Sequence, residues 1–200
     1  MLSFDRVDFG YPQQTALVLR QFSLALPERG VVCLVGPSGC GKTTALRLLA
    51  GLESPLAGTL KGRSGLRVSM VFQEDRLLPW ESVLDNAITD RQPWHRTQAL
   101  SWLQALGLGD HLDARVADLS GGMRRRVAIA RALAAPHDVL LLDEPFTGLD
   151  EPTWRDAAER IAAASRHRLV VMTTHLIQQA EAMDAEVIAL IPVPLPAVEE

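Results

Sequence analysis

A glycine-rich segment between an apolar run and a helical pattern is the feature that most constrains the fold of this 200-residue chain. The apolar run is Val31–Val35, and the helical pattern is Lys42–Ala50, which ends at Gly51. Between them the sequence reads Gly36, Pro37, Ser38, Gly39, Cys40, Gly41, Lys42 and Thr43. Glycines let successive backbone N–H groups turn toward one concavity, which forms an anion cradle with the N-terminus of the following helix. This order predicts a phosphate-binding loop (P-loop) rather than an ordinary turn.

A second apolar run, Val139–Leu142, ends in the adjacent acids Asp143 and Glu144. A buried strand that stops in two carboxylates needs a reason, because unpaired buried charge is costly. Beside a P-loop the reason is Mg²⁺, whose water shell Asp143 would hold while the Thr43 hydroxyl ligates the ion. Lys42 would reach the outer phosphates, Thr44 would add to the cradle, and Glu144 would orient or deprotonate the attacking water. Together the two motifs predict an ATPase that uses ATP and Mg²⁺.

Short apolar runs that predict strands alternate with helical patterns along the chain. The predicted strands are Leu2–Phe9, Phe22–Leu26, Val31–Val35, Val68–Phe72, Val139–Leu142, Leu169–Thr173 and Val187–Leu190. The runs that begin at Val31, Val139 and Leu169 are continuous, as expected for parallel strands covered on both faces. The helical patterns are Lys42–Ala50, Gly121–Ala135 and a segment from Asp150 to about Ser165. The fold class is therefore predicted as an α/β P-loop NTPase core with a mostly parallel central sheet and an antiparallel β edge.

Residues 75–118 differ from the rest, since they contain a helical pattern at Trp94–Leu106 and no convincing strand. We interpret them as a small helical lobe inserted into a single domain that spans residues 1–200. Residues 191–200 alternate proline with apolar residues and are expected to form a flexible tail.

A third motif, Leu119–Met123, is followed by three arginines. Ser120 is a natural N-cap, and Gly121 and Gly122 would allow a phosphate to approach the helix N-terminus closely. By itself such a start could be only a solvated cap. Beside the two earlier motifs, however, the segment resembles the signature motif of the ABC (ATP-binding cassette) ATPases, and this resemblance extends over nearly the whole chain.

Further residues resemble ABC site residues and occur in the expected order. The resemblance implies that Tyr11 stacks on adenine, that Gln73 is the glutamine of the Q-loop and a Mg²⁺ ligand, that Asp150 belongs to the D-loop, and that His175 contacts the γ-phosphate. Gln73 and His175 would then act with Lys42 and Glu144 in catalysis. Each has a simpler alternative: Tyr11 could fill a gap near a strand end, Gln73 could be a polar strand terminus, and His175 could cap a helix.

The resemblance also implies the working unit. In this family ATP lies between the P-loop of one subunit and the signature motif of the other, so two copies related by a two-fold axis would bury two nucleotides. Ser120 and Gly122 would contact the γ-phosphate across the interface. The predicted partner is therefore a second copy of this chain.

Two features narrow the resemblance within the family, one a departure from the usual signature and the other a further likeness. The signature ends in Met123 instead of the usual glutamine, and Val71–Trp80 with Val83–Asn86 looks like the nitrate, sulfonate and taurine importers. These features predict a subunit that energises solute import through a separate membrane permease, with a substrate-binding protein as an indirect partner. Leu77, Leu78 and Trp80 could receive a short permease helix, or they could pack inside the helical lobe.

No apolar run approaches the ~20 residues that span a bilayer. The chain is therefore expected in the cytoplasm, peripheral on the inner face of the plasma membrane. The net charge of −4 argues against a nucleic-acid partner.

The alternative is a soluble ABC ATPase that acts on DNA or ribosomes. It is disfavoured because the span from Thr43 to Ser120 has no room for a long coiled coil and only one cassette is present. A GTPase or small-molecule kinase has less support, since Asn86 is the only asparagine and the Asn-Lys guanine-reading motif is absent.

Overall fold

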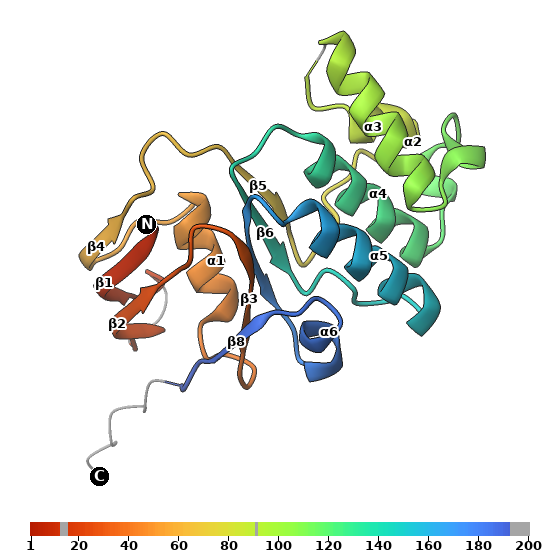
Figure 1. Ribbon diagram of the computed structural model, residues 1–200. Helices are drawn as coiled ribbons and strands as arrows, with labels where there is room; N and C mark the ends of the chain where they lie inside the picture. The colour runs from red at the N-terminus through yellow and green to blue at the C-terminus, as the bar shows by residue number, and fades with distance from the viewer. Residues whose placement is uncertain (13–15, 91, 193–200) are drawn as a thin grey trace.

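The computed structural model, shown in Figure 1, describes residues 1–12, 16–90 and 92–192. A five-stranded parallel sheet in the order β5-β6-β7-β3-β8 lies at the centre, and a three-stranded antiparallel sheet in the order β2-β1-β4 lies beside it. The strands are β1 (Ser3–Phe9), β2 (Leu19–Ala25), β3 (Gly30–Val35), β4 (Ala57–Lys61), β5 (Val68–Val71), β6 (Val139–Asp143), β7 (Leu169–Thr173) and β8 (Glu186–Ala189). The helices are α1 (Lys42–Ala50), α2 (Val83–Ala87), α3 (Pro93–Ala105), α4 (Gly121–Ala134), α5 (Glu151–Ala164) and α6 (Ile177–Glu181). The predicted α/β P-loop fold is confirmed.

The central strands are buried on both faces, and their side chains alternate between two hydrophobic clusters. Along β6, Leu140 and Leu142 face the cluster that includes α4 and α5, whereas Val139 and Leu141 face the cluster that includes α1. This alternation follows from the period of two in a strand. It explains why the sequence of β6 is a continuous apolar run.

Local signals in the sequence set where the main helices begin and end. Gly51 closes α1 in the left-handed region, and its N–H donates to the carbonyls of Arg47 and Leu48. The Ser120 hydroxyl accepts a hydrogen bond from Met123 N at the start of α4, and Asp150 accepts one from Thr153 N at the start of α5. These caps satisfy backbone N–H groups that the helices leave unpaired.

Three elements were not predicted from the sequence: β4, α2 and α6. One predicted strand was misplaced, because β2 begins at Leu19 and ends at Ala25 instead of spanning Phe22–Leu26. Its register with β1 draws Leu19 opposite Phe9, so tertiary pairing extends the strand toward the N-terminus. Of the predicted flexible tail, residues 193–200 lie outside the described residues.

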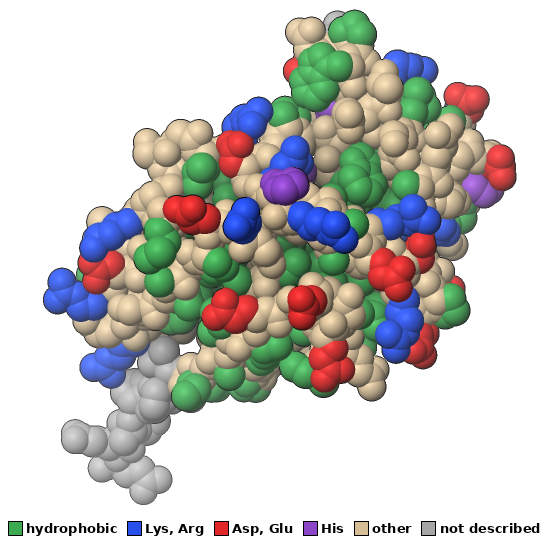
Figure 2. Space-filling view, in the orientation of Figure 1, with side chains coloured by type: hydrophobic (Ala, Val, Ile, Leu, Met, Phe, Trp, Pro, Cys, Tyr) green, Lys and Arg blue, Asp and Glu red, His purple; other side chains and the backbone are tan. Residues whose placement is uncertain are grey.

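Helices α2 and α3 lie apart from both sheets and pack against α4 (Figure 1). Lysine and arginine side chains alternate with aspartate and glutamate over the face shown in Figure 2, rather than forming one basic surface. Within the described part of the chain, every helix is too short or too polar to cross a lipid bilayer.

Candidate nucleotide-binding site

A pocket of about 400 Å³ lies where the loops after four parallel strands come together. The loops after β3, β5, β6 and β7 supply the P-loop, Gln73, Glu144 and His175. Ligand sites of open parallel sheets form at this carboxyl edge. The pocket is lined by Tyr11, Val18, Ser38, Gly39, Gly41, Lys42, Thr43, Thr44, Gln73, Glu144 and His175. The structure thus gathers residues from opposite ends of the sequence around one cavity.

The P-loop backbone has a shape that side chains would prevent. Gly36 has φ 152°, and a Cβ on it would lie 2.6 Å from the carbonyl oxygen of Leu190 and 2.8 Å from Cys40 Sγ. Gly41 has φ 99°, and its Cβ would lie 2.7 Å from a methyl group of Leu19. Both positions therefore require glycine for the loop to close.

Lys42 lies under the loop with its side chain directed back along it. Its ammonium donates hydrogen bonds to the carbonyl oxygens of Gly36 at 2.7 Å and Pro37 at 3.0 Å. The residue is 6% exposed. A buried ammonium needs such acceptors, and the phosphate oxygens of a nucleotide would satisfy it in the same way.

Asp143 lies behind the pocket, at the end of β6, and is 2% exposed. Its Oδ1 accepts hydrogen bonds from the hydroxyls of Thr43 at 3.1 Å and Thr173 at 2.7 Å. Hydroxyl and carboxylate oxygens are hard donors, and Mg²⁺ is commonly held by one or two protein ligands together with substrate phosphates. The pair Thr43 and Asp143 therefore fits a magnesium ion. Gln73 is exposed on the pocket wall.

Glu144 and His175 form a pair in the pocket. His175 Nε2 lies 2.8 Å from Glu144 Oε1, and the Thr147 hydroxyl lies 3.4 Å from Glu144 Oε2. The backbone of Glu144 has φ 46°, in the left-handed region. That conformation costs a non-glycine residue about 1–2 kcal/mol. Thr173 opposes this strain, because its Oγ1 accepts a hydrogen bond from Glu144 N at 3.0 Å.

Tyr11 forms one wall of the pocket and is held by its neighbours. Its hydroxyl lies 3.3 Å from Thr44 Oγ1 and accepts a hydrogen bond from Arg47 Nη1 at 3.4 Å. Its ring packs edge-to-face against Phe9, with 5.0 Å between the ring centroids. The ring is thus oriented before any ligand arrives.

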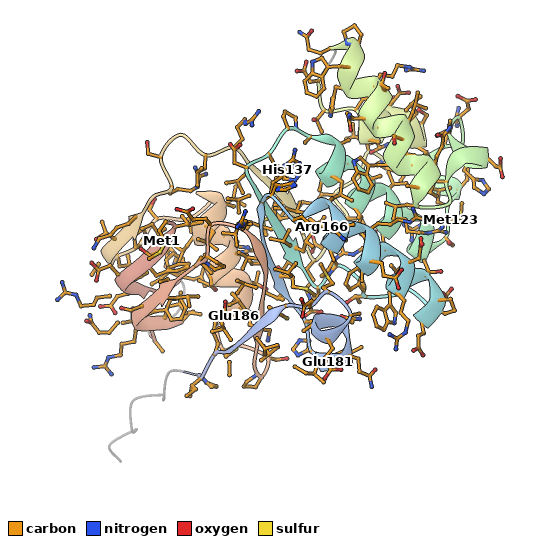
Figure 3. All side chains as sticks on the ribbon, viewed as in Figure 1. Met1, Met123, His137, Arg166, Glu181 and Glu186 are labelled. Carbon is orange, nitrogen blue, oxygen red and sulfur yellow. The ribbon has the colours of Figure 1, made fainter. Side chains whose placement is uncertain are left out.

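The signature segment does not line this pocket. Ser120, Gly121 and Gly122 begin α4, and Met123 beside them lies among the helices in Figure 3, away from β3. Asp150 is also outside the pocket wall, where hydrogen bonds from Thr153 lower the pKa of its carboxyl. The structure thus separates the two predicted anion sites on the surface of one chain.

Several residues at the site were missed by the sequence reasoning. Val18 lines the pocket although nothing in its neighbourhood marks it as a binding residue. Thr173 contacts both Asp143 and Glu144, and only its position two residues before His175 could have indicated this. Arg125 appeared in the sequence as one of three exposed-looking arginines, yet it is buried behind Glu144.

Cys40 gives a first test of the site. We expect that alkylation of Cys40 blocks nucleotide binding and that ATP protects the thiol, because a bulky adduct would occupy the phosphate cradle. Cys40 is only 2% exposed, so the reaction should be slow. Mass spectrometry of the modified peptides together with nucleotide-binding titrations would measure both effects.

Cys33 is the internal control for this reaction. It is fully buried in β3, and burial raises the pKa of its thiol to about 12. Since the thiolate is the reactive form, Cys33 should stay unmodified in the folded protein. Normal ATP binding by protein alkylated at Cys40 would contradict the prediction.

Comparison with known proteins points to one family. A family model described as ABC transporter matches residues 19–147. The aliphatic sulfonates import ATP-binding protein SsuB 1 of Rhodococcus jostii (strain RHA1) is 41% identical over 197 residues, which cover 95% of this chain and 80% of that protein. The taurine import ATP-binding protein TauB of Rhizobium johnstonii (strain DSM 114642 / LMG 32736 / 3841) is 39% identical, covering 90% of this chain and 74% of that protein.

A solved structure shares the fold. The dimeric structure of a post-hydrolysis state of the ATP-binding cassette MJ0796 bound to ADP and Pi matches with a TM-score of 0.84 and 27% identity, covering 95% of this chain and 94% of that one.

Proposed function

From the premise that this chain belongs to the ABC transporter family as an ATP-hydrolysing, ATP-binding subunit, we propose that it drives import of small organosulfonates, such as taurine, through a separate permease. The observation that carries the motor part of this proposal is the pocket in which Tyr11, the P-loop, Glu144 and His175 meet. The cargo class rests on the import functions for which the relatives from Rhodococcus jostii and Rhizobium johnstonii are named.

Nucleotide binding follows from the contacts around the P-loop. The N–H groups of residues 36–43 and the Lys42 ammonium bind the β- and γ-phosphates, and Tyr11 stacks on the adenine. Thr43 and Asp143 would hold Mg²⁺, and Gln73, which also lines the pocket, would be a further ligand. The ion, when bound, neutralises charge on the outer phosphates.

Hydrolysis is assigned to the pair that faces the pocket. Glu144 accepts a proton from the attacking water, which makes the water a better nucleophile for the γ-phosphorus. His175, 2.8 Å from Glu144, orients that carboxylate and reaches the γ-phosphate from the same chain. Gln73, which lines the same pocket, helps to position that water.

The complete site needs a second copy of the chain. Ser120, Gly121 and Gly122 are exposed or half-exposed at the N-terminus of α4 and do not line their own pocket. There they would bind the γ-phosphate of the partner. Asp150 would lie at the same interface. Two such contacts related by a two-fold axis form an isologous dimer, in keeping with the dimeric cassette that the chain resembles.

The permease is proposed to dock beside the segment Leu78–Trp80. Trp80 is 68% exposed and Leu78 48% exposed, so neither packs inside the helical lobe. Leu77, in contrast, packs against the hydrophobic cluster that includes α4 and α5. Asn86 holds this segment, since it accepts a hydrogen bond from Leu78 N at 2.7 Å and donates one to Leu78 O at 3.0 Å. We assign residues 75–118 to a helical subdomain that presents this surface on the inner face of the membrane.

Uptake of radiolabelled taurine and of an aliphatic sulfonate tests the proposed cargo. Cells that lack the gene should lose this uptake and regain it with the wild-type gene, whereas uptake of an unrelated solute such as an amino acid should be unchanged. Normal sulfonate uptake in the deletion strain would overturn the cargo assignment without affecting the ATPase assignment.

The docking surface predicts the behaviour of a tryptophan variant. Trp80→Ala should abolish co-purification with the permease and reduce uptake at least tenfold, because a tryptophan at the centre of an interface often contributes about 2 kcal/mol or more. The exposed side chain makes few contacts within the chain, so the melting temperature and the basal ATPase rate should not change.

Trp94→Ala is the matched control, since Trp94 is also an exposed tryptophan, 49% accessible, but belongs to α3. If both variants retain the permease, the segment Leu78–Trp80 is not the docking surface.

A further inference from the structure

Arg125 is a charged residue buried in the middle of the molecule, and the mechanism above does not use it. It lies in the second turn of α4 and is 3% exposed. Among the described residues its ionic partner is Asp75, whose Oδ1 lies 3.1 Å from Nη1. A buried guanidinium is costly unless most of its N–H groups find acceptors. The acceptors that it finds are backbone carbonyl groups at the edge of the candidate site.

One group of acceptors belongs to the loop after β5, which carries Gln73. Arg125 Nη1 donates to the carbonyl oxygens of Phe72 at 2.6 Å and Gln73 at 3.3 Å, in addition to Asp75. The main chain on both sides of the Gln73 side chain is therefore attached to α4. Gln73 itself is exposed on the pocket wall.

The other group belongs to the end of β6, which carries both acids. Arg125 Nη2 donates to the carbonyl oxygens of Asp143 at 2.8 Å and Glu144 at 2.7 Å, and Nε donates to Pro145 O at 2.8 Å. The left-handed peptide of Glu144 is thus fixed at its N–H by Thr173 and at its carbonyl by Arg125. Without the second contact the backbone can relax toward an ordinary conformation and carry the carboxylate away from the pocket.

We propose that Arg125 is a positioning residue for ATP hydrolysis, which sets the distance between Gln73 and Glu144 by binding the main chain of both loops. This inference rests on the proposed roles of those two residues. Arg125 also lies in the helix that Ser120 caps, five residues further along, so the arrangement of both loops is tied to the helix that would contact the partner's nucleotide. Binding both loops at once needs the planar, forked guanidinium that only arginine provides, since lysine carries one rotatable ammonium.

The neighbouring arginines show that this arrangement is specific to position 125. Arg126 donates to Leu106 O at 2.8 Å, inside the lobe, and Arg131 donates to Asp75 O at 2.9 Å and Arg76 O at 2.8 Å. Within the described part of the chain, neither donates a hydrogen bond to the main chain of Glu144 or Gln73. Arg125 alone among them joins the two loops.

The test compares Arg125→Met and Arg125→Lys with the wild-type chain in steady-state ATP hydrolysis and in binding of a fluorescent ATP analogue. For Arg125→Met we expect kcat to fall about 100-fold, because a shift of reacting groups by about 1 Å can have that effect. The dissociation constant of the analogue should change less than about threefold, since the P-loop is untouched. Arg125→Lys keeps the charge and some of the donors, so its kcat should lie between the other two.

Arg126→Met is the matched control, because it removes a neighbouring guanidinium from α4 without touching either loop. It should keep wild-type kcat, although loss of its hydrogen bond to Leu106 O lowers the thermal stability. If Arg125→Met does not fold, Arg125→Lys carries the test on its own. Wild-type kcat in the Arg125 variants, or an equal loss of kcat and of analogue binding, overturns the proposal.

A double-mutant cycle with Glu144→Gln separates this inference from the proposed function. If Arg125 acts through Glu144, Arg125→Met should reduce the residual rate of Glu144→Gln by less than about threefold. A further 100-fold loss in the double variant means that Arg125 acts elsewhere, and the proposal fails. A wild-type rate for Glu144→Gln alone would instead refute the role of Glu144.

Discussion

Replacing Glu144 by glutamine is expected to stop ATP hydrolysis while leaving ATP binding intact. Glutamine has the size of glutamate and can keep the contact with His175, but it cannot accept a proton from water. General-base groups contribute about 10²–10⁴-fold to rate, so a loss of at least about 100-fold in kcat should follow. The P-loop contacts do not involve this side chain. Bound ATP should therefore persist.

The Glu144→Gln variant should also form a stable dimer when ATP is bound. Because ATP is not consumed, it continues to link the two P-loops to the partner's signature segments, and a stable dimer should appear in size-exclusion chromatography with ATP. Without nucleotide the variant should elute as the wild type does. Glu151→Gln is the control, since Glu151 undergoes the same chemical change on an exposed face, where its ion-pair partner among the described residues is Arg155. A Glu144→Gln protein that hydrolyses ATP at the wild-type rate would remove Glu144 from its role.

Two inactive variants are expected to restore activity when they are mixed. Lys42→Ala disables the P-loop, and Gly122→Asp places a carboxylate where the signature segment should meet the γ-phosphate. A dimer with one copy of each contains one site with both defects and one site with neither. With random pairing, about a quarter of all sites are intact. ATP hydrolysis should therefore rise clearly above that of either variant alone.

The structure indicates that Gly122→Asp leaves the fold intact. A Cβ at Gly122 would lie 3.4 Å from Gly148 O and from Leu149 Cδ2, at the limit of ordinary contact, and acidic residues are favoured in the first turn of a helix. Monomer binding of a fluorescent ATP analogue should be unchanged in this variant and lost in Lys42→Ala. Mixing Lys42→Ala with a second preparation of itself provides the blank. If the mixture of the two variants stays inactive, the signature segment does not complete its partner's site.

The buried centre of the fold could be predicted from the sequence, because continuous apolar runs and capping residues leave few alternatives. The edges could not. Strand β4 is mostly exposed and contains Gly58, so it lacks the apolar pattern of a strand and is held by its pairing with β1. Helix α2 has five residues, too few to show a helical period, and begins at the Ser82 cap. Such elements depend on partners that are distant in the sequence.

The site was predictable where chemistry forces a local pattern, as in the P-loop and in Asp143 and Glu144. It was not predictable where a side chain from one element donates hydrogen bonds to the backbone of another element. Arg125 looked like the middle of a solvated run of three arginines, but Ala128, Ile129 and Ala132 lie three, four and seven residues further on and are all buried. That spacing places Arg125 on the inner face of α4. The sequence held the signal, although not the identity of the carbonyl groups that it binds.

The left-handed backbone at Glu144 has a consequence for laboratory evolution. Glycine adopts this conformation freely and asparagine nearly so, and relief of the strain would contribute about 1 kcal/mol. The amino acid that turnover needs at this position is therefore not the one that the main chain prefers. A library selected only for thermal stability would therefore become enriched in glycine or asparagine at residue 144. The selected proteins would be stable but would not hydrolyse ATP. Any effort to raise the thermal stability of this chain must therefore measure ATP hydrolysis, as phosphate release, together with the melting temperature.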